Sequence, residues 1–145
     1  MAVNISPPAL NSSFLAPGVI TKEITAVVDM TTAAASFTIA ETIPAGSVVI
    51  SAAMSVQNTI QAATAVKIGL GRLTATADPD KYLLSTALTA EELAKPVNQW
   101  ATPLTAEETL AVFACDTNGA AAGTIGGGAD DAVIVRIVYL RALPI

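Results

Sequence analysis

The run from residue 37 to residue 60 constrains the fold most strongly, because apolar residues recur along it at every second position. A period of two is typical of a β-strand with one buried face. In the second half of the run, the residues expected on the buried face are Val48, Ile50, Ala52, Met54 and Val56. Between the halves lies Ile43-Pro44-Ala45-Gly46-Ser47, whose proline and glycine favour a tight turn. The run therefore predicts a β-hairpin with a bulge at its turn.

Other segments share this alternation and are separated by turns rich in Gly and Pro. The further strands are expected at residues 19–30, at 63–70 with Val66, Ile68 and Leu70 inward, at 109–115 and at 130–140. Residues 71–86 are expected to form a long loop. Residues 89–94 are expected to form one helical turn, because a threonine followed by acids can cap a helix start.

About seven or eight strands with little helix imply an all-β fold, a single-domain antiparallel β-sandwich. The jelly roll is the favoured topology, but other sandwich topologies stay open because periodicity does not encode strand order. The last strand, residues 130–140, is apolar on both faces. We therefore expect the opposing sheet to cover one face of this strand, and a partner or an arm to cover the other.

Length and charge exclude several classes of partner. A chain of 145 residues is long enough for one domain with a sizeable core, since folding buries roughly 68–70% of the unfolded surface. There are 12 Asp and Glu residues against 7 Lys and Arg residues, and the basic residues are scattered. Binding to nucleic acid or to an anionic membrane needs a basic patch, so neither is expected. No apolar run reaches about 18 residues, so no membrane span is expected either.

The start of the chain and its cysteine content indicate where it is made. Residues 1–10 lack the basic region and the long apolar region of a signal peptide. The single cysteine, Cys115, cannot form an internal disulfide. Both observations fit synthesis in a reducing cytoplasm.

Residues 1–18 are predicted to form an extended N-terminal arm, followed by the sandwich domain at residues 19–145. Pro7-Pro8 and Pro17-Gly18 interrupt any regular element in the arm. A disordered terminus and an arm that docks on a neighbouring subunit are both open readings. Trp100 is a further candidate contact, because tryptophan is enriched in binding hot spots, although a lone tryptophan is commonly a core residue. The residues expected at an interface are Pro7, Pro8, Leu10, Phe14, Leu15 and Trp100.

The residue types that carry catalysis are poorly represented. The sequence has no histidine, which is the commonest general base and a frequent metal ligand. Cys115 has no histidine to activate it and is expected to be a small buried side chain. The glycine-rich run at residues 123–128 precedes a strand and lacks the lysine of a phosphate loop, so it is expected to be an inter-strand loop. No catalytic residue and no cofactor are predicted, and the protein is not expected to be an enzyme.

Adjacent acids occur at Glu91-Glu92, Glu107-Glu108 and Asp130-Asp131. Neighbouring residues of a strand point to opposite faces, so these pairs are not acid–base dyads and are expected to be solvated turn charges. Asp78-Pro79-Asp80 lacks the spaced ligands of a known calcium motif. No metal site is predicted, although a loop metal at Asp78, Asp80, Asp130 or Asp131 stays open.

The order of these features resembles a family of small phage structural proteins, the head decoration or cement proteins of tailed bacteriophages. The segments that carry the resemblance are a short arm, FTIAETIPAGSVVISAAMSV, ATAVKIGLG, PLTAEETLAVFA, a Gly-rich loop and the closing AVIVRIVYL. The match covers most of residues 19–140 and is one of pattern.

The resemblance implies a jelly-roll or related sandwich that binds the outer surface of a capsid as a homotrimer. Such a protein would bridge neighbouring subunits of the major capsid protein and would reinforce the head. It would belong to the virion exterior after synthesis in the host cytoplasm. The alternative is a head-fibre, spike or tail-associated β-sandwich that binds a host receptor or glycan, although the chain is poor in aromatic residues.

Overall fold

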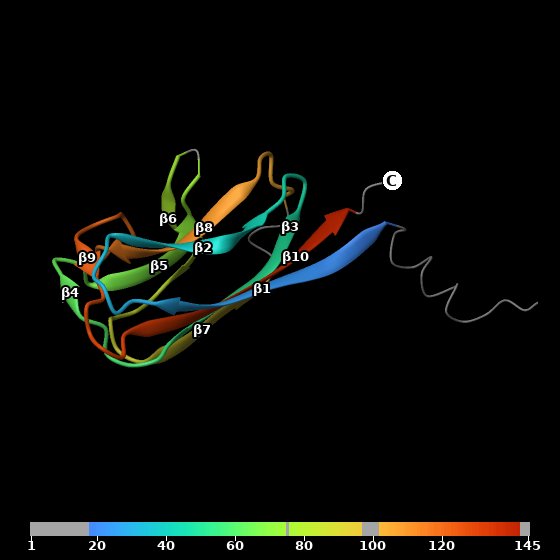
Figure 1. Cartoon of the computed structure of the whole chain (residues 1–145). Helices are drawn as coiled ribbons and strands as arrows, with labels where there is room; N and C mark the ends of the chain where they lie inside the picture. The colour runs from blue at the N-terminus through green and yellow to red at the C-terminus, as the bar shows by residue number, and fades with distance from the viewer. Residues whose placement is uncertain (1–17, 75, 97–101, 143–145) are drawn as a thin grey trace, which may run out of the picture.

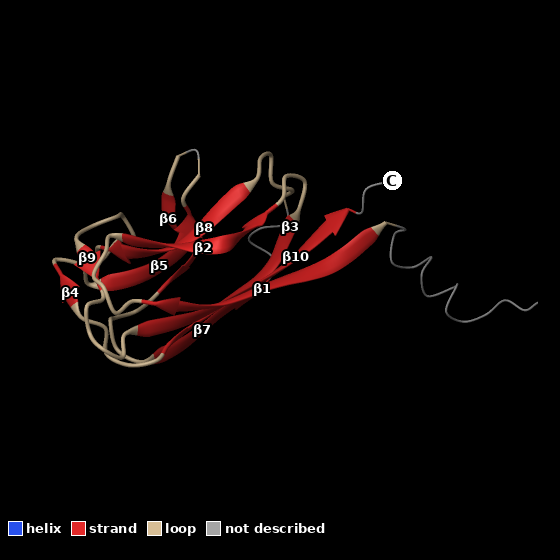
Figure 2. Cartoon of the chain, viewed as in Figure 1, coloured by secondary structure: helices blue, strands red, loops and turns tan. Residues whose placement is uncertain are grey.

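The computed structural model describes residues 18–74, 76–96 and 102–142, and these residues form a β-sandwich without helices (Figures 1 and 2). The first sheet has the order β1-β10-β3-β7, and its strands are Val19–Asp29, Ala132–Ala142, Val48–Val56 and Glu91–Pro96. The second sheet has the order β2-β8-β5-β6, and its strands are Ser36–Ile43, Glu108–Cys115, Lys67–Arg72 and Asp78–Leu84. Two short strands, β4 (Ala62–Ala63) and β9 (Thr124–Ile125), pair separately. All paired strands are antiparallel, which confirms the predicted fold class.

The predicted hairpin within residues 37–60 is wrong, because β2 and β3 belong to different sheets. The segment between them does turn tightly: the Ser47 amide donates to the Pro44 carbonyl at 3.2 Å, and Gly46 has φ +82°. The turn also pairs with another loop, since the Gly46 amide donates to the Leu104 carbonyl at 2.7 Å. The chain therefore crosses from the second sheet to the first at this turn instead of folding back on itself.

A β-bulge in β3 changes which side chains face the core. Val138 of β10 lies opposite Ser51 and Tyr139 lies opposite Val49, which leaves Ile50 as the extra residue. Such a bulge reverses the alternation on one side of it. The predicted inward positions Ala52, Met54 and Val56 are buried, as is Val49, whereas Val48 and Ile50 are only half-buried. The predicted core face is therefore right after the bulge and wrong before it.

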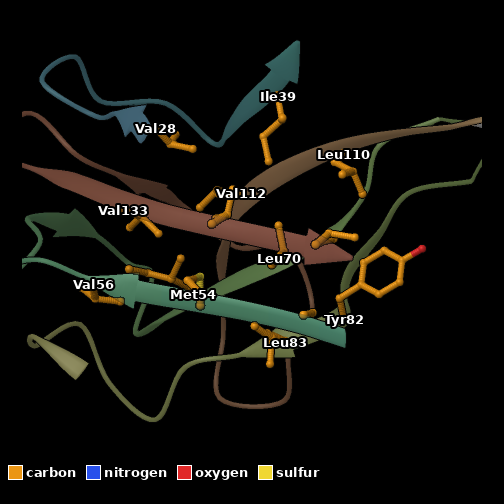
Figure 3. Close-up of a cluster of buried hydrophobic side chains, with 14 of the residues drawn as sticks. Val28, Ile39, Met54, Val56, Leu70, Tyr82, Leu83, Leu110, Val112 and Val133 are labelled. Carbon is orange, nitrogen blue, oxygen red and sulfur yellow. The ribbon is translucent and has the colours of Figure 1, made fainter. Parts of the chain in front are cut away.

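The core lies between the two sheets, and both sheets contribute to it (Figure 3). Side chains that meet there include Val28 and Val133 from the first sheet, and Ile39, Leu70 and Val112 from the second. In the last strand, the odd-numbered residues from Val133 to Tyr139 face the core, and each is at most 5% exposed. In β5, Ile68 and Leu70 are buried as expected, but Val66 precedes the strand and is 46% exposed.

Two further sequence predictions fail. Residues 71–86 contain β6, because Tyr82 and Leu83 supply buried core side chains after the turn-like Asp78-Pro79-Asp80. Residues 89–94 do not form a helical turn, and most of them belong to β7. The acid that was expected to support a helix start, Glu91, instead accepts hydrogen bonds from the amides of Thr86 and Ala87. It therefore fixes the loop that precedes the strand.

Candidate functional site

The outer faces of the two sheets differ, and the difference identifies a candidate binding surface. On the second sheet, Ala111, Phe113 and Cys115 point away from the main core, yet they are buried. The start of β6 lies over this side: a Cβ added to Gly69 would lie 2.3 Å from the Pro79 carbonyl oxygen and 2.8 Å from Cys115 Sγ. Glycine in β5 therefore permits a close backbone approach. The start of β6 therefore covers the part of this outer face that is formed by β5 and β8.

The first sheet has no comparable cover among the described residues. The outward side chains of β10 alternate with its buried ones, and Ile134, Val138 and Leu140 are each partly exposed. Val27 of β1, which lies opposite Ile134, is 70% exposed. We call the outward surface of β1, β10, β3 and β7 the open face. It corresponds to the second apolar face that the sequence predicts for the last strand.

One ion pair crosses the open face. Arg136 Nη2 lies 2.7 Å from Glu23 Oε2, and Arg136 Nε donates to the same oxygen at 2.8 Å. These hydrogen bonds, together with one from Thr25, lower the pKa of the Glu23 carboxyl. Both side chains are about half exposed, so their pairing contributes little to stability. The open face is thus mainly apolar, with one charged pair within it.

A shallow hollow of about 310 Å³ lies on the open face over β10, β3 and β7. Its lining includes Ala53, Ser55, Ala94, Ile134 and Arg136. Small side chains on β3 create the depression, because Ala53 and Ser55 lie opposite the larger Arg136 and Ile134. The hollow could receive an apolar side chain from a partner.

A second pocket, of about 320 Å³, borders a buried ionic cluster in the second sheet. Glu108 is 3% exposed, and its carboxylate accepts from Lys81 Nζ, from the Tyr82 hydroxyl and, at 3.5 Å, from Arg72 Nη1. Lys81 also lies over the Tyr82 ring, 5.2 Å from its centroid. Burial, and then the hydrogen bond to Glu108, raise the pKa of Tyr82. Three donors hold this carboxylate in place, so Glu108 has a structural role.

The expectation that the paired acids are solvated turn charges is wrong for one member of two of the pairs. Glu108 is buried as described, and Asp131 is 3% exposed. Asp131 accepts hydrogen bonds from Asn58 Nδ2 at 3.2 Å, from the Gln61 amide at 3.1 Å and from the Gly128 amide at 3.0 Å. It therefore joins two loops at one end of the sandwich. Glu91 fixes a third loop, so all three acids have structural roles.

The residues expected at an interface, Pro7, Pro8, Leu10, Phe14, Leu15 and Trp100, all lie outside the described residues. Cys115 is buried as predicted, and burial, followed by the charges of Asp80 and Asp116, raises the pKa of its thiol to about 11. Within residues 18–74, 76–96 and 102–142, no three His, Cys, Asp or Glu side chains gather as a metal site would require. The same part of the chain contains no helix that is long and apolar enough to cross a membrane.

Sequence reasoning missed the buried acids, but the signal was present. Glu108 is in the same period-two phase as the buried residues Leu110, Val112 and Ala114. Asp131 likewise precedes the inward series that starts at Val133. An acid in the inward phase of a strand needs buried hydrogen-bond partners, because an unpaired buried charge is costly. The alternation therefore marks which member of each pair points inward.

Comparisons with known proteins bear on the fold. No protein-family model matches the sequence, and no curated protein matches it. A chain in the capsid of Ralstonia phage GP4 is similar in structure, with 15% sequence identity, a TM-score of 0.56, and coverage of 88% of this chain and 87% of that chain. A chain of the cyanophage Pam1 capsid asymmetric unit has 14% identity, a TM-score of 0.45 and coverage of 87% and 85%. A chain of the acidic stable capsid of Helicobacter pylori bacteriophage KHP30 has 11% identity, a TM-score of 0.46 and coverage of 84% and 94%. The chain thus shares its fold with a chain of a phage capsid.

Proposed function

We propose that this protein is a structural component of a phage virion that binds the outer surface of the capsid as a trimer and cements neighbouring capsid subunits. The observation that carries the proposal is the fold likeness to a chain of the Ralstonia phage GP4 capsid over 88% of this chain and 87% of that one. The mutual coverage means that the two chains are of similar length.

The strand order supports a jelly roll. If only the eight longer strands are numbered along the chain, the two sheets run 1-8-3-6 and 2-7-4-5. Only β5 and β6 are consecutive long strands of one sheet, and every other step between consecutive long strands crosses to the opposite sheet. Two interlocked Greek keys produce this order, and the arrangement is common in viral capsid domains. We infer the jelly-roll topology from this order.

The open face supports a binding role. Half-exposed Ile134, Val138 and Leu140 form an apolar surface, and the hollow beside Ala53 makes part of that surface concave. Exposed apolar surfaces of this kind mark interaction sites, and the apolar core of an interface contributes much of its stability. We assign the open face to contact with the major capsid protein. The arm residues Pro7, Pro8, Leu10, Phe14 and Leu15, with Trp100, remain proposed as contacts between subunits.

The proposal is tested with capsids that lack this protein. Purified full-length protein is mixed with such capsids, bound positions are imaged, and the particles are then challenged with heat and chelator. We expect density at regular outer positions and greater resistance of the decorated capsids. Binding at no regular position, or binding without any gain in resistance, would count against cementing.

A matched pair of variants tests the assignment of the open face. Val138→Lys places a charge on the open face at a half-exposed position, and Ala120→Lys places the same charge on an exposed loop residue. We expect the first to weaken capsid binding at least tenfold and the second to leave it unchanged, because an unpaired charge at an interface is costly to desolvate. Equal binding by both variants would remove the open face from the contact.

A further inference from the structure

Two edge strands leave one side of the sandwich open. β1 pairs only with β10, and β2 pairs only with β8, so each has a free hydrogen-bonding edge among the described residues. A cavity of about 350 Å³ lies between residues 26–29 of β1 and residues 37–40 of β2. We call this cavity the edge groove. Figure 1 shows β1 and β2 in different layers of the sandwich.

The edge groove has an apolar lining. Val28 and Ile39 are 7% and 4% exposed, and Ala26 and Phe37 are partly buried against the core. A bulge in β2 adds to the opening, since Thr38 pairs with Ala111 but the next paired residue is Thr42. Residues 39–41 therefore lie outside the regular ladder. A strand that approached this side would find both free backbone groups and apolar side chains.

The other two sheet edges are better protected. β7 is six residues long and ends at Pro96, and β6 contains Pro79 within its irregular first part. Proline and short, irregular strands are the usual means of blocking pairing at a sheet edge. β1 is eleven residues long and has no proline; its charged residues are Lys22 and Glu23, which precede the edge groove, and Asp29, which lines its end. The β1 side is thus the edge that is best suited to accept a further strand.

We propose that residues 9–16 of one copy of this chain, which follow Pro7-Pro8, occupy the edge groove of the next copy and extend the first sheet at β1. Residues 1–17 carry no Asp, Glu, Lys or Arg, so the arm brings no charged side chain into a groove whose lining is apolar except for Asp29 and Thr38. Leu10, Phe14 and Leu15 supply apolar side chains for the lining. Strand addition of this kind takes its affinity from main-chain hydrogen bonds and its specificity from side-chain pockets.

The junction between arm and domain favours a neighbouring copy over the same copy. Gly18 has φ +84° and directly follows Pro17. Two-residue hairpin loops favour type I′ and type II′ turns, and both types need a positive φ at the first central residue, which proline cannot adopt. A Pro-Gly pair instead suits a type II turn, which splays the flanking strands. The Pro17-Gly18 pair therefore disfavours a two-residue hairpin between the arm and the β1 strand of its own copy.

The reach of the arm is sufficient for this exchange. Seventeen extended residues span roughly 56 Å, whereas the eleven residues of β1 span roughly 36 Å. The arm is therefore long enough to run along the whole of a neighbouring β1, including its far half, where the edge groove lies. The inference rests on the proposed assembly of several copies, and it names the contact that links them.

Photo-crosslinking of the full-length chain tests this contact. Phe14 is replaced by benzoyl-phenylalanine, and equal amounts of isotope-labelled and unlabelled protein are mixed, both free in solution and bound to capsids. We expect crosslinks from position 14 to peptides of residues 19–29 or 36–43, with mixed-isotope pairs as frequent as unmixed ones. Crosslinks within one copy only, crosslinks solely to the capsid protein, or no crosslink to these peptides in either sample would overturn the proposal.

A matched pair of substitutions locates the contact within the edge groove. Ala40→Arg fills the groove from an exposed position, and Ala45→Arg places the same side chain on an exposed turn outside it. We expect the first to reduce the crosslink yield at least fivefold and the second to leave it unchanged. Capsid binding is measured on the same samples. If the protein binds capsids but gives no crosslink in the edge groove, only this inference is refuted. If the crosslink forms but the protein does not bind capsids, only the proposed function is refuted.

Discussion

Removal of the buried carboxylate of Glu108 should destabilise the sandwich more than any neighbouring surface change. The Glu108 side chain is 5% exposed and accepts from Lys81, the Tyr82 hydroxyl and Arg72. Glu108→Ala leaves two cations facing each other and removes an acceptor from a buried hydroxyl. Breaking a buried ion pair by removing one partner typically costs about 3–5 kcal/mol.

The lower end of this range applies here. The side chains of Lys81 and Arg72 are 20% and 29% exposed, so water can reach the two cations once the carboxylate is gone. We therefore expect Glu108→Ala to cost about 3 kcal/mol of unfolding free energy. At roughly 2–4 °C per kcal/mol for a chain of this size, the melting temperature should fall by about 6–12 °C. Glu108→Gln keeps the shape and one acceptor, and should cost about 1–2 kcal/mol.

Urea denaturation at pH 7, followed by fluorescence and circular dichroism, measures these values. Glu107→Ala is the matched control, because Glu107 is the exposed neighbour whose carboxylate only accepts from the Thr42 hydroxyl. The control should change the unfolding free energy by no more than about 0.5 kcal/mol. If Glu108→Ala is indistinguishable from Glu107→Ala, the cluster does not stabilise the fold as reasoned here. Lys81→Met combined with Glu108→Gln in a double-mutant cycle then isolates the pairwise coupling.

Three further predictions concern other buried polar groups. Asp131→Ala should lower the unfolding free energy by about 3 kcal/mol and speed amide exchange at residues 58–61, because three donors lose their acceptor. In the same denaturation assay, Asp130→Ala at the exposed neighbouring position should lower it by no more than about 0.5 kcal/mol. The folded-state pKa of Tyr82 is raised, so the protonated hydroxyl stabilises the fold fully at neutral pH. This stabilisation is lost only as the pH rises above about 10, where the unfolded chain releases the proton. Alkaline denaturation curves of Tyr82→Phe should therefore show a smaller loss of unfolding free energy in that range than those of the unsubstituted protein. The thiol of Cys115, with its pKa raised to about 11, should react with a thiol reagent at pH 8 only at the rate of unfolding, and rapid reaction in the folded protein would contradict its burial.

The sequence predicted the strands that carry strict alternation and apolar content. In β10, the alternation is unbroken from Val133 to Tyr139, and the strand lies at the predicted place in the sequence. In β3, the predicted faces are wrong before Ile50, because a bulge inserts one residue and bulges leave no mark on periodicity. The β6 strand was missed because Asp78-Pro79-Asp80 has the composition of a turn, although Tyr82 and Leu83 follow it into the core.

Strand pairing could not be predicted, and the error at residues 43–47 shows why. Pro44 and Gly46 specify a tight turn, which the structure contains. Whether a turn joins two strands of one sheet or passes between two sheets depends on pairings with distant strands, here β8 for one side and β10 for the other. The open face was inferred from the two-sided apolar pattern of the last strand. The edge groove was not inferred, because it arises from two edge strands that only the tertiary fold brings together.

The position of β10 has a consequence for how the chain folds. The last strand lies between β1 and β3, so the first strand has no sheet partner among the described residues until residues 132–142 have been synthesised. A ribosome adds about 5–20 residues per second, so the first sheet can be completed only after β10 has been synthesised. With almost every connection crossing between sheets, folding depends on long-range pairings and is expected to take milliseconds to seconds. The second sheet is complete in sequence by Cys115, whereas a chain that stops before β10 leaves the β1 strand without the partner that holds it in the first sheet.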